Sequence, residues 1–275
     1  MVDGESEAAD IVEHYELDYD ESGRITRGYQ QLELVRTREI VGRHLPPGPL
    51  QVLDVGGGTG AHARWLAEAG HQVLLVDLVP RHVQAARALA EEGLSVRAEL
   101  GDARQLDIAD ESFDAVLLLG PLYHLTDRGD RVRALREAGR VAKPGCLVFA
   151  AAISRFASLF DGLARGFLFD PAFRSIVERD LAEGQHRNPD RHPGWFTTAY
   201  LHHPDELMSE AAEARLRTVE IVGVEGLCAW LPQLAEQWED PERREVILES
   251  IRAVESEACL RALSPHLLLI ARRPG

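Results

Sequence analysis

The segment 54–60, which reads Asp54-Val55-Gly56-Gly57-Gly58-Thr59-Gly60, sets a carboxylate just before closely spaced glycines. Glycine accepts positive φ angles and lets a ligand touch backbone that a Cβ would cover. A helix that starts in such a loop offers free N–H groups to an anionic ligand group. The spacing is G-x-G-x-G rather than the G-x-G-x-x-G of dinucleotide sites, and Asp54 suits an ammonium group better than a pyrophosphate. We therefore expect this loop to bind the amino-acid part of a ligand.

Two further carboxylates follow predicted strands and extend this binding site. Asp77, followed by Leu78, comes 21 residues after Gly56 and can accept hydrogen bonds from the hydroxyls of a ribose. Asp102, followed by Ala103, comes after the next predicted strand and can accept a hydrogen bond from an adenine amine. Because the carboxyl ends of parallel strands meet at one crevice, the three positions together describe a site for S-adenosylmethionine (SAM).

These residues resemble the ordered motifs of class I SAM-dependent methyltransferases. The resemblance rests on 54–60, Asp77, 101–103 and the run Phe113-Asp114-Ala115-Val116-Leu117-Leu118, and it covers about residues 50–153. It implies a doubly wound α/β fold with a mainly parallel, seven-stranded sheet whose last strand is antiparallel. It also implies SAM as the cofactor, S-adenosylhomocysteine as the product, and a small-molecule acceptor of the kind that bacterial members of the family methylate.

The fourth predicted strand ends in Leu119-Gly120-Pro121-Leu122-Tyr123-His124. In the family this end lies beside the transferred methyl group, so Leu119 is expected at the cofactor. His124 is a candidate general base, because an imidazole pKa of about 6.5 suits proton removal at neutral pH; the alternative is a histidine that packs beside a helix. Tyr123 either lines the acceptor pocket or packs. The Asn/Asp-Pro-Pro-aromatic stretch of nucleobase and glutamine methyltransferases is absent, which argues against nucleic acid as the acceptor.

A second candidate group, Tyr200, His202 and His203, lies where residues 196–204 lead into another predicted helix. Tyr200 is expected to contact the substrate, and His202 either removes a proton from the acceptor or only flanks the helix. Adjacent histidines point in different directions on most backbones, and no acidic residue nearby has a metal-ligand spacing. The three cysteines lie far apart and form no CxxC pair. The sequence therefore predicts no metal site.

The first 45 residues are expected to form a helical lid that ends at the break Pro46-Pro47-Gly48-Pro49. Tyr15 and Tyr19 lie four residues apart and so share one face of a helix. Both are candidates for walls of the acceptor pocket, and the alternative is an ordinary amphipathic helix.

Beyond residue 46, short apolar runs alternate with segments of helical periodicity. Strands are predicted at 51–55, 72–76, 95–99, 114–119, 146–153, 216–224 and 266–271, and helices at 59–69, 80–92, 129–142 and 204–213. Strands that are apolar on both faces and separated by helices are typical of a parallel sheet covered on two sides. The pattern predicts a doubly wound core over 46–275, interrupted by inserts at about 154–203 and 227–263 that cap one edge of the sheet.

Composition narrows the class of partner. The chain of 275 residues has 30 Lys+Arg against 45 Asp+Glu and a net charge of −15. We expect neither nucleic acid nor a membrane as a partner, because such a field repels polyanions and no apolar run reaches the roughly 20 residues of a bilayer span. The acidic start MVDGESEAAD is not typical of a secretory signal. The sequence thus predicts a cytoplasmic protein, and pairing of two chains as a homodimer through the inserts stays open.

The predicted function is transfer of the SAM methyl group to an O or N atom of a small metabolite. Methyl transfer is an in-line displacement, so positioning supplies much of the acceleration, and a base is needed only where the acceptor keeps its proton. Three alternatives stay open. They are a SAM-binding protein of the same fold with another reaction, such as a cyclase or a decarboxylase; a non-catalytic protein that senses SAM or binds a partner; and an NAD-dependent oxidoreductase, which the glycine spacing disfavours.

Overall fold

The computed structural model describes residues 31–192 and 194–275, and all that follows concerns these residues. Tyr15, Tyr19 and the first 30 residues of the expected lid lie outside this range. Within it, nine strands form one sheet with the order β3-β2-β1-β4-β5-β7-β6, and β9 and β8 continue from β5. The strands are β1 Gln51–Val55, β2 Gln72–Asp77, β3 Val96–Leu100, β4 Phe113–Leu118, β5 Ala142–Ser154, β6 Gln185–His186, β7 Ala199–His202, β8 Arg217–Gly223 and β9 His266–Arg272.

The predicted doubly wound sheet is confirmed, with two extra strands. β3, β2, β1, β4 and β5 pair in parallel, and β9 pairs antiparallel with both β5 and β8. These seven strands are the expected sheet with its antiparallel last strand. β7 joins only the end of β5, where Ile153 pairs with Leu201 and Ser154 with His202, and β6 pairs with β7. Both extra strands come from the insert at 154–203.

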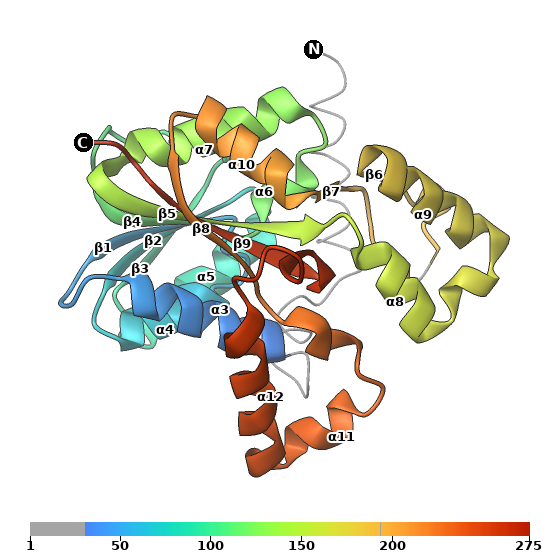
Figure 1. The fold of residues 1–275 in the computed structure, drawn as a ribbon. Coiled ribbons are helices and arrows are strands. Elements are labelled where there is room, and N and C mark those ends of the chain that lie inside the picture. The colour runs from blue at the N-terminus through green and yellow to red at the C-terminus, as the bar shows by residue number, and fades with distance from the viewer. Residues whose placement is uncertain (1–30, 193) are drawn as a thin grey trace.

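Helices cover both faces of the sheet (Figure 1). On one face lie α3 Gln31–His44, α4 Ala61–Glu68 and α5 Pro80–Glu91. On the other face lie α6 Pro121–His124, α7 Arg128–Val141 and α10 Pro204–Glu213. Each face has its own apolar core, and alternate residues of a strand contribute to the two cores: in β1, Val52 belongs to one, whereas Leu53 and Val55 belong to the other. Strands that are apolar on both faces therefore reflect burial on both faces.

Most predicted boundaries agree with the structure to within two residues, and β5 is the exception. It was expected at 146–153 because Lys143-Pro144-Gly145 reads as a break, yet it begins at Ala142. Phe113 pairs with Ala142 and Ala115 with Leu147, so the strand passes the Pro-Gly pair through an irregularity in register rather than ending there. A bulge accommodates residues that a regular ladder would not.

The two inserts fold as small helical units beyond the carboxyl end of β5 (Figure 1). The first contains α8 Ala157–Arg165, the short helix Phe167–Phe169 and α9 Pro171–Glu183. The second contains the short helices Gly226–Trp230 and Arg261–Leu263 on either side of α11 Leu234–Glu239 and α12 Pro241–Val254. Among the described residues no helix has the length and apolar character needed to cross a bilayer.

The second insert packs against both α3 and β8, and the Gly223 amide of β8 donates to the Glu255 carbonyl at 2.9 Å. Leu32 of α3 shares a buried apolar cluster with Trp238 of α11 and Ile251 of α12. The fully buried guanidinium of Arg36 donates to the Glu255 carboxylate just after α12 and to the Val224 carbonyl just after β8, the latter at 3.2 Å. These contacts fix α3 relative to the carboxyl edge of the sheet.

A buried polar network joins α7 to α10 on the opposite face. Arg131 donates three hydrogen bonds to the Glu210 carboxylate at 2.7–3.1 Å, and both side chains are 1 % exposed. The Glu210 carboxylate also lies 3.1 Å from Nε2 of His202, and the Arg131 guanidinium lies 3.5 Å from the centre of the Tyr200 ring. The ion pair thus holds the end of β7 against both helices.

Replacing Arg131 by Ala should lower the free energy of unfolding by about 3–5 kcal/mol, because the buried Glu210 carboxylate would lose its cation. Arg133→Ala on the same helix is the matched control. Arg133 lies 3.4 Å from the Asp130 carboxylate and its side chain is 59 % exposed, so its loss should cost less than about 1 kcal/mol. Urea unfolding of both variants measures the two costs, and equal costs would contradict the assignment.

Candidate cofactor site

A cavity opens at the carboxyl ends of β1, β2, β3 and β4, where the sequence predicted a shared crevice. Its empty space is about 1190 Å³, with the open solvent at its mouth included. It is lined by residues 55–59, 61–62, 77–79, 82, 101–104, 119–121, 123–125 and Glu33. The predicted residues Gly56, Gly58, Thr59, Asp77, Leu78, Asp102, Ala103, Leu119, Tyr123 and His124 are among them.

The glycine loop shapes one wall of this cavity. Gly56 has a φ of 69°, and a Cβ on it would lie 2.5 Å from the ring of Pro121. Gly58 has a φ of 57°, again in the left-handed region that favours glycine. The loop after β1 therefore lies directly against the segment after β4, and α4 starts beyond it at Ala61. Gly60 ends the loop but does not line the cavity.

Asp77 is held firmly at the end of β2. Its Oδ2 accepts a hydrogen bond from the Gly58 amide at 2.9 Å, and its Oδ1 accepts one from the Val79 amide at 2.9 Å. Nδ1 of the buried His82 lies 3.2 Å from the same Oδ1. A carboxylate has about four acceptor positions and three are in use, so the fixed group keeps capacity for one hydroxyl of a ligand, on Oδ2.

Asp102 is an anion on the neighbouring wall. It pairs with Arg104 at 2.6 Å, and Arg104 also pairs with Asp130 at 2.8 Å. Partial burial raises the pKa of the Asp102 carboxyl, but the hydrogen bonds and charge of Arg104 outweigh it and hold the pKa below its usual value. Asp102 is thus a charged acceptor beside the apolar surface of Ala103 and Leu78.

Asp54 lies behind the glycine loop rather than on the cavity wall. Its side chain is fully buried, and a Cβ on Gly57 would lie 2.6 Å from its Oδ2. Burial, and then the nearby charge of Asp77, raise the pKa of the Asp54 carboxyl to about 7. Asp54 can therefore act on a ligand through the loop in front of it, and its charge changes near neutral pH.

His124 and Tyr123 line the end of the cavity after β4. The two rings lie 4.7 Å apart edge to face, and Phe196 from the first insert stacks on His124 at 6.2 Å. His124 is 8 % exposed. The imidazole therefore lies at the border between the cavity and an aromatic wall that the insert supplies.

His202 and Tyr200 lie outside this cavity. His202 is fully buried in the α7–α10 network, where burial lowers its pKa, so the ring is neutral at neutral pH. Tyr200 stacks on Arg131, and its hydroxyl accepts a hydrogen bond from Arg155 at 3.3 Å. The structure brings together the residues of the glycine loop, Asp77, Asp102 and His124, and it keeps this second predicted group apart from them.

The cavity residues that were not predicted from the sequence include Glu33, His62 and His82. Burial lowers the pKa of His62 to about 4, with Glu33 opposing the shift, and Trp65 donates to its Nδ1 at 3.3 Å. His62 lies in the first turn of α4, just after the glycine loop, and His82 lies in the first turn of α5, just after Asp77. Their places in the sequence could therefore have identified them as cavity residues. Glu33 lies far from every motif in sequence, and only the packing of α3 brings it to the cavity.

Comparison with known proteins finds similarity to methyltransferases. A family model described as a methyltransferase domain matches residues 52–145. A ubiquinone biosynthesis O-methyltransferase of Methylocella silvestris is 36 % identical over 132 residues, which is 43 % of this chain and 50 % of that protein. Another, from Azorhizobium caulinodans, is 29 % identical over 198 residues, 68 % of this chain and 70 % of that protein. The match thus spans only half the length of the first relative.

Solved structures agree on the fold. The (4+2)-cyclase SpnF superposes with a TM-score of 0.57 at 21 % sequence identity, over 94 % of this chain and 85 % of that one. Since a cyclase shares the fold, fold similarity alone does not separate methyl transfer from other reactions.

Asp54→Asn should change how stability depends on pH. A carboxyl whose pKa is raised to about 7 in the folded protein lowers the free energy of unfolding as pH rises from about 4 to 7, by about 1.4 kcal/mol per unit of pKa difference. The asparagine side chain of the variant does not titrate, so the variant lacks this pH-dependent loss of stability. Between pH 5 and pH 8, its free energy of unfolding, measured with urea and without ligand, should therefore rise relative to that of the wild type.

Asp114→Asn is the control, because the pH dependence that Asp114 gives to stability has the opposite sign. Slight burial raises the pKa of Asp114, but Lys143 at 2.7 Å outweighs it and lowers the pKa. The stabilising effect of Asp114 is therefore present at neutral pH and lost as pH falls. Parallel pH profiles of Asp54→Asn and the wild type would contradict the raised pKa.

Proposed function

We propose that this protein transfers the methyl group of SAM to an oxygen or nitrogen atom of a small organic acceptor, a proposal supported by the methyltransferase family model that matches residues 52–145. The observation that carries the proposal is one cavity that joins the glycine loop, the Asp77 carboxylate and the His124 ring. These are the three kinds of group that a nucleoside sulfonium with an amino-acid tail and an attacking acceptor would need.

Each part of the cofactor has a counterpart on the wall of the cavity. The loop from Gly56 to Thr59 accommodates the methionine part, and the buried Asp54 behind it supplies negative potential toward the ammonium group. Asp77 accepts from a ribose hydroxyl. Asp102, with the apolar side chains of Leu78 and Ala103, receives the adenine. The cofactor supplies an electrophilic methyl group on a positively charged sulfur.

The residues of this chain then orient the acceptor and take its proton. We assign the base to His124 rather than His202, because His124 lines the cavity whereas His202 is fully buried and bonded to Glu210. Tyr123 and Phe196 hold the His124 ring from two sides. A base placed this way contributes typically 10²- to 10⁴-fold, and alignment of the reacting atoms contributes the rest.

A hydroxyl-bearing acceptor is favoured over nucleic acid. The relatives named ubiquinone biosynthesis O-methyltransferases methylate oxygen, and the net charge of −15 opposes the approach of a polyanion. The ring of Tyr123, which lines the cavity, and the ring of Phe196, which stacks on His124, suit a flat or apolar acceptor.

A second candidate function is a ring-forming reaction without methyl transfer. It is favoured by one observation, the likeness to the cyclase SpnF over 94 % of this chain. The two functions differ in product, because only methyl transfer releases S-adenosylhomocysteine in proportion to the acceptor consumed.

Asp77→Ala should abolish measurable binding of S-adenosylhomocysteine, an affinity loss of at least 100-fold, because both the ribose acceptor and the anchor of the Gly58 amide disappear. Isothermal calorimetry on the full chain measures the affinity. Asp110→Ala, at a 68 % exposed carboxylate that pairs with Arg140, is the control and should bind as the wild type does. Unchanged affinity in Asp77→Ala, with folding checked by circular dichroism, would refute the cofactor site.

Incubation of the protein with SAM and a panel of small phenols, alcohols and amines should release S-adenosylhomocysteine and methylated acceptor in a 1:1 ratio. With the acceptor so found, His124→Asn should lower kcat by 10²-fold or more. Its rate should recover at high pH, where the acceptor loses its proton unaided.

His202→Asn serves as the matched comparison, since His202 lies outside the cavity and its loss should leave the shape of the pH profile unchanged. Product without S-adenosylhomocysteine would favour the ring-forming reaction instead. A wild-type pH profile in His124→Asn would remove His124 from the chemistry.

A further inference from the structure

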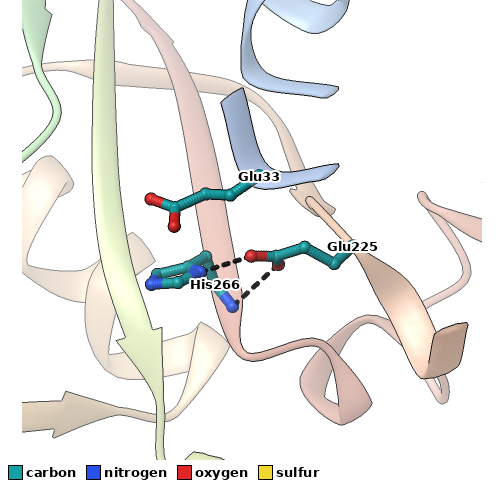
Figure 2. A group of neighbouring side chains, drawn as sticks. All are labelled: Glu33, Glu225 and His266. Atoms are coloured by element: carbon teal, nitrogen blue, oxygen red, sulfur yellow. Dashed lines mark hydrogen bonds and ion pairs between the residues drawn. The ribbon is translucent and has the colours of Figure 1, made fainter. Parts of the chain in front are cut away.

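Three side chains from separate parts of the chain meet beyond the cofactor cavity (Figure 2). Glu33 lies in the first turn of α3, Glu225 follows β8, and His266 is the first residue of β9. One carboxylate oxygen of each glutamate and one ring nitrogen of the histidine lie within 4.8 Å of one another. Among the described residues, this is the one group of three or more His, Cys, Asp or Glu side chains with that geometry.

Two of the three side chains are held rigidly. Nδ1 of His266 lies 2.5 Å from Oε1 of Glu225, and Oε2 of Glu225 accepts from the Ser264 hydroxyl at 2.9 Å and the His266 amide at 3.2 Å. The Ser264 hydroxyl also accepts from the Glu225 amide at 3.0 Å. Glu225 is 4 % exposed. The pair is therefore fixed before any ligand arrives.

The third side chain is brought to this pair by α3. Arg36, one turn after Glu33, donates to the carbonyl of Val224, the residue just before Glu225. Arg36 also pairs with Glu255, and Leu32 is buried against the second insert. These contacts lock Glu33 beside Glu225 although the two lie almost two hundred residues apart in sequence.

The donor atoms of this group suit a cation. Two carboxylates close together repel each other. Glu225 is bonded to His266 and to the Ser264 hydroxyl, and among the described residues neither Lys nor Arg is bonded to it. A shared cation would offset the repulsion of the two glutamates and accept a lone pair from the imidazole.

We propose that Glu33, Glu225 and His266 bind one divalent transition-metal ion of the Zn²⁺, Co²⁺ or Mn²⁺ type. An imidazole with two carboxylates suits these ions, whereas Mg²⁺ and Ca²⁺ prefer oxygen ligands alone. The ion takes the place of the proton between His266 and Glu225, and any proton on the ring is released to solvent. Three protein ligands leave a position open, as in catalytic rather than structural zinc sites.

The open position gives the metal a role next to the acceptor. Glu33 lines the cofactor cavity as well as the metal site, and its charge acts on His62 in that cavity. A metal ion there binds an anionic oxygen, so the site selects acceptors that carry a hydroxyl or carboxylate oxygen. This second step rests on the proposed methyl transfer, whereas the metal site itself does not.

Calorimetric titration of the untagged full chain with Zn²⁺, and with Co²⁺ followed by its visible absorption, tests the site. We expect one ion per chain, no displacement by excess Mg²⁺, and a rise in Tm with added Zn²⁺. Glu33→Gln, Glu225→Gln and His266→Ala should each weaken binding at least 10-fold. Glu33→Gln is the most telling variant, because Glu225 and His266 also hold β8 to β9.

His44→Ala is the matched control. Nε2 of His44 lies 3.5 Å from Oε2 of Glu220, a histidine–glutamate pair that no third acid joins among residues 31–192 and 194–275. Its loss should leave Zn²⁺ affinity unchanged. No saturable binding to the wild type, or wild-type affinity in all three ligand variants, would overturn the metal site.

Binding of S-adenosylhomocysteine to the same wild-type sample separates the two proposals. If it binds and the metal does not, the metal site fails and the cofactor site stands. If the metal binds with the expected loss in the variants while S-adenosylhomocysteine does not bind, the metal site stands and the proposed methyl transfer fails.

Discussion

The cavity depends on one carboxylate that ties two strand ends together. Asp77, the last residue of β2, accepts from the Gly58 amide with one oxygen and from the Val79 amide with the other, each at 2.9 Å. The loop after β1 and the start of α5 therefore keep a fixed spacing, and the same loop touches Pro121 after β4. A buried carboxylate is costly unless it is hydrogen-bonded. Here the bonds that lower this cost also set the shape of the site.

A buried arginine, Arg36, attaches a helix to the sheet in a similar way. Arg36 joins α3 to the end of β8 and to the residue after α12 through bonds to Val224 and Glu255. Because the guanidinium is fully buried, both partners are needed to compensate for its desolvation. The helix that carries Glu33 is thereby attached to the sheet edge that carries Glu225 and His266, and the cofactor cavity and the proposed metal site share one wall.

The sequence was sufficient to predict cavity residues that lie at the carboxyl end of a strand. The loop at 56–59, Asp77 and Asp102 were found because parallel strands end at one edge, whatever the details of packing. The meeting of Glu33, Glu225 and His266 could not be predicted from the sequence, because it depends on how α3 and the second insert pack. Local periodicity carries no information on such contacts. The helices at 157–165 and 171–183 were missed for a related reason, since this insert buries only short apolar stretches against itself.

Three histidines show why residue type alone could not assign the roles. His62 lines the cavity, yet burial lowers its pKa to about 4, so it stays neutral and is a poor proton acceptor there. His202 has an acidic partner in Glu210, as a catalytic base often does, but it is fully buried in a network that holds α7 to α10. His124, in contrast, lines the cavity at the end of β4. A base must first reach the proton it removes, so its position in the cavity is the reason for proposing His124 rather than His202.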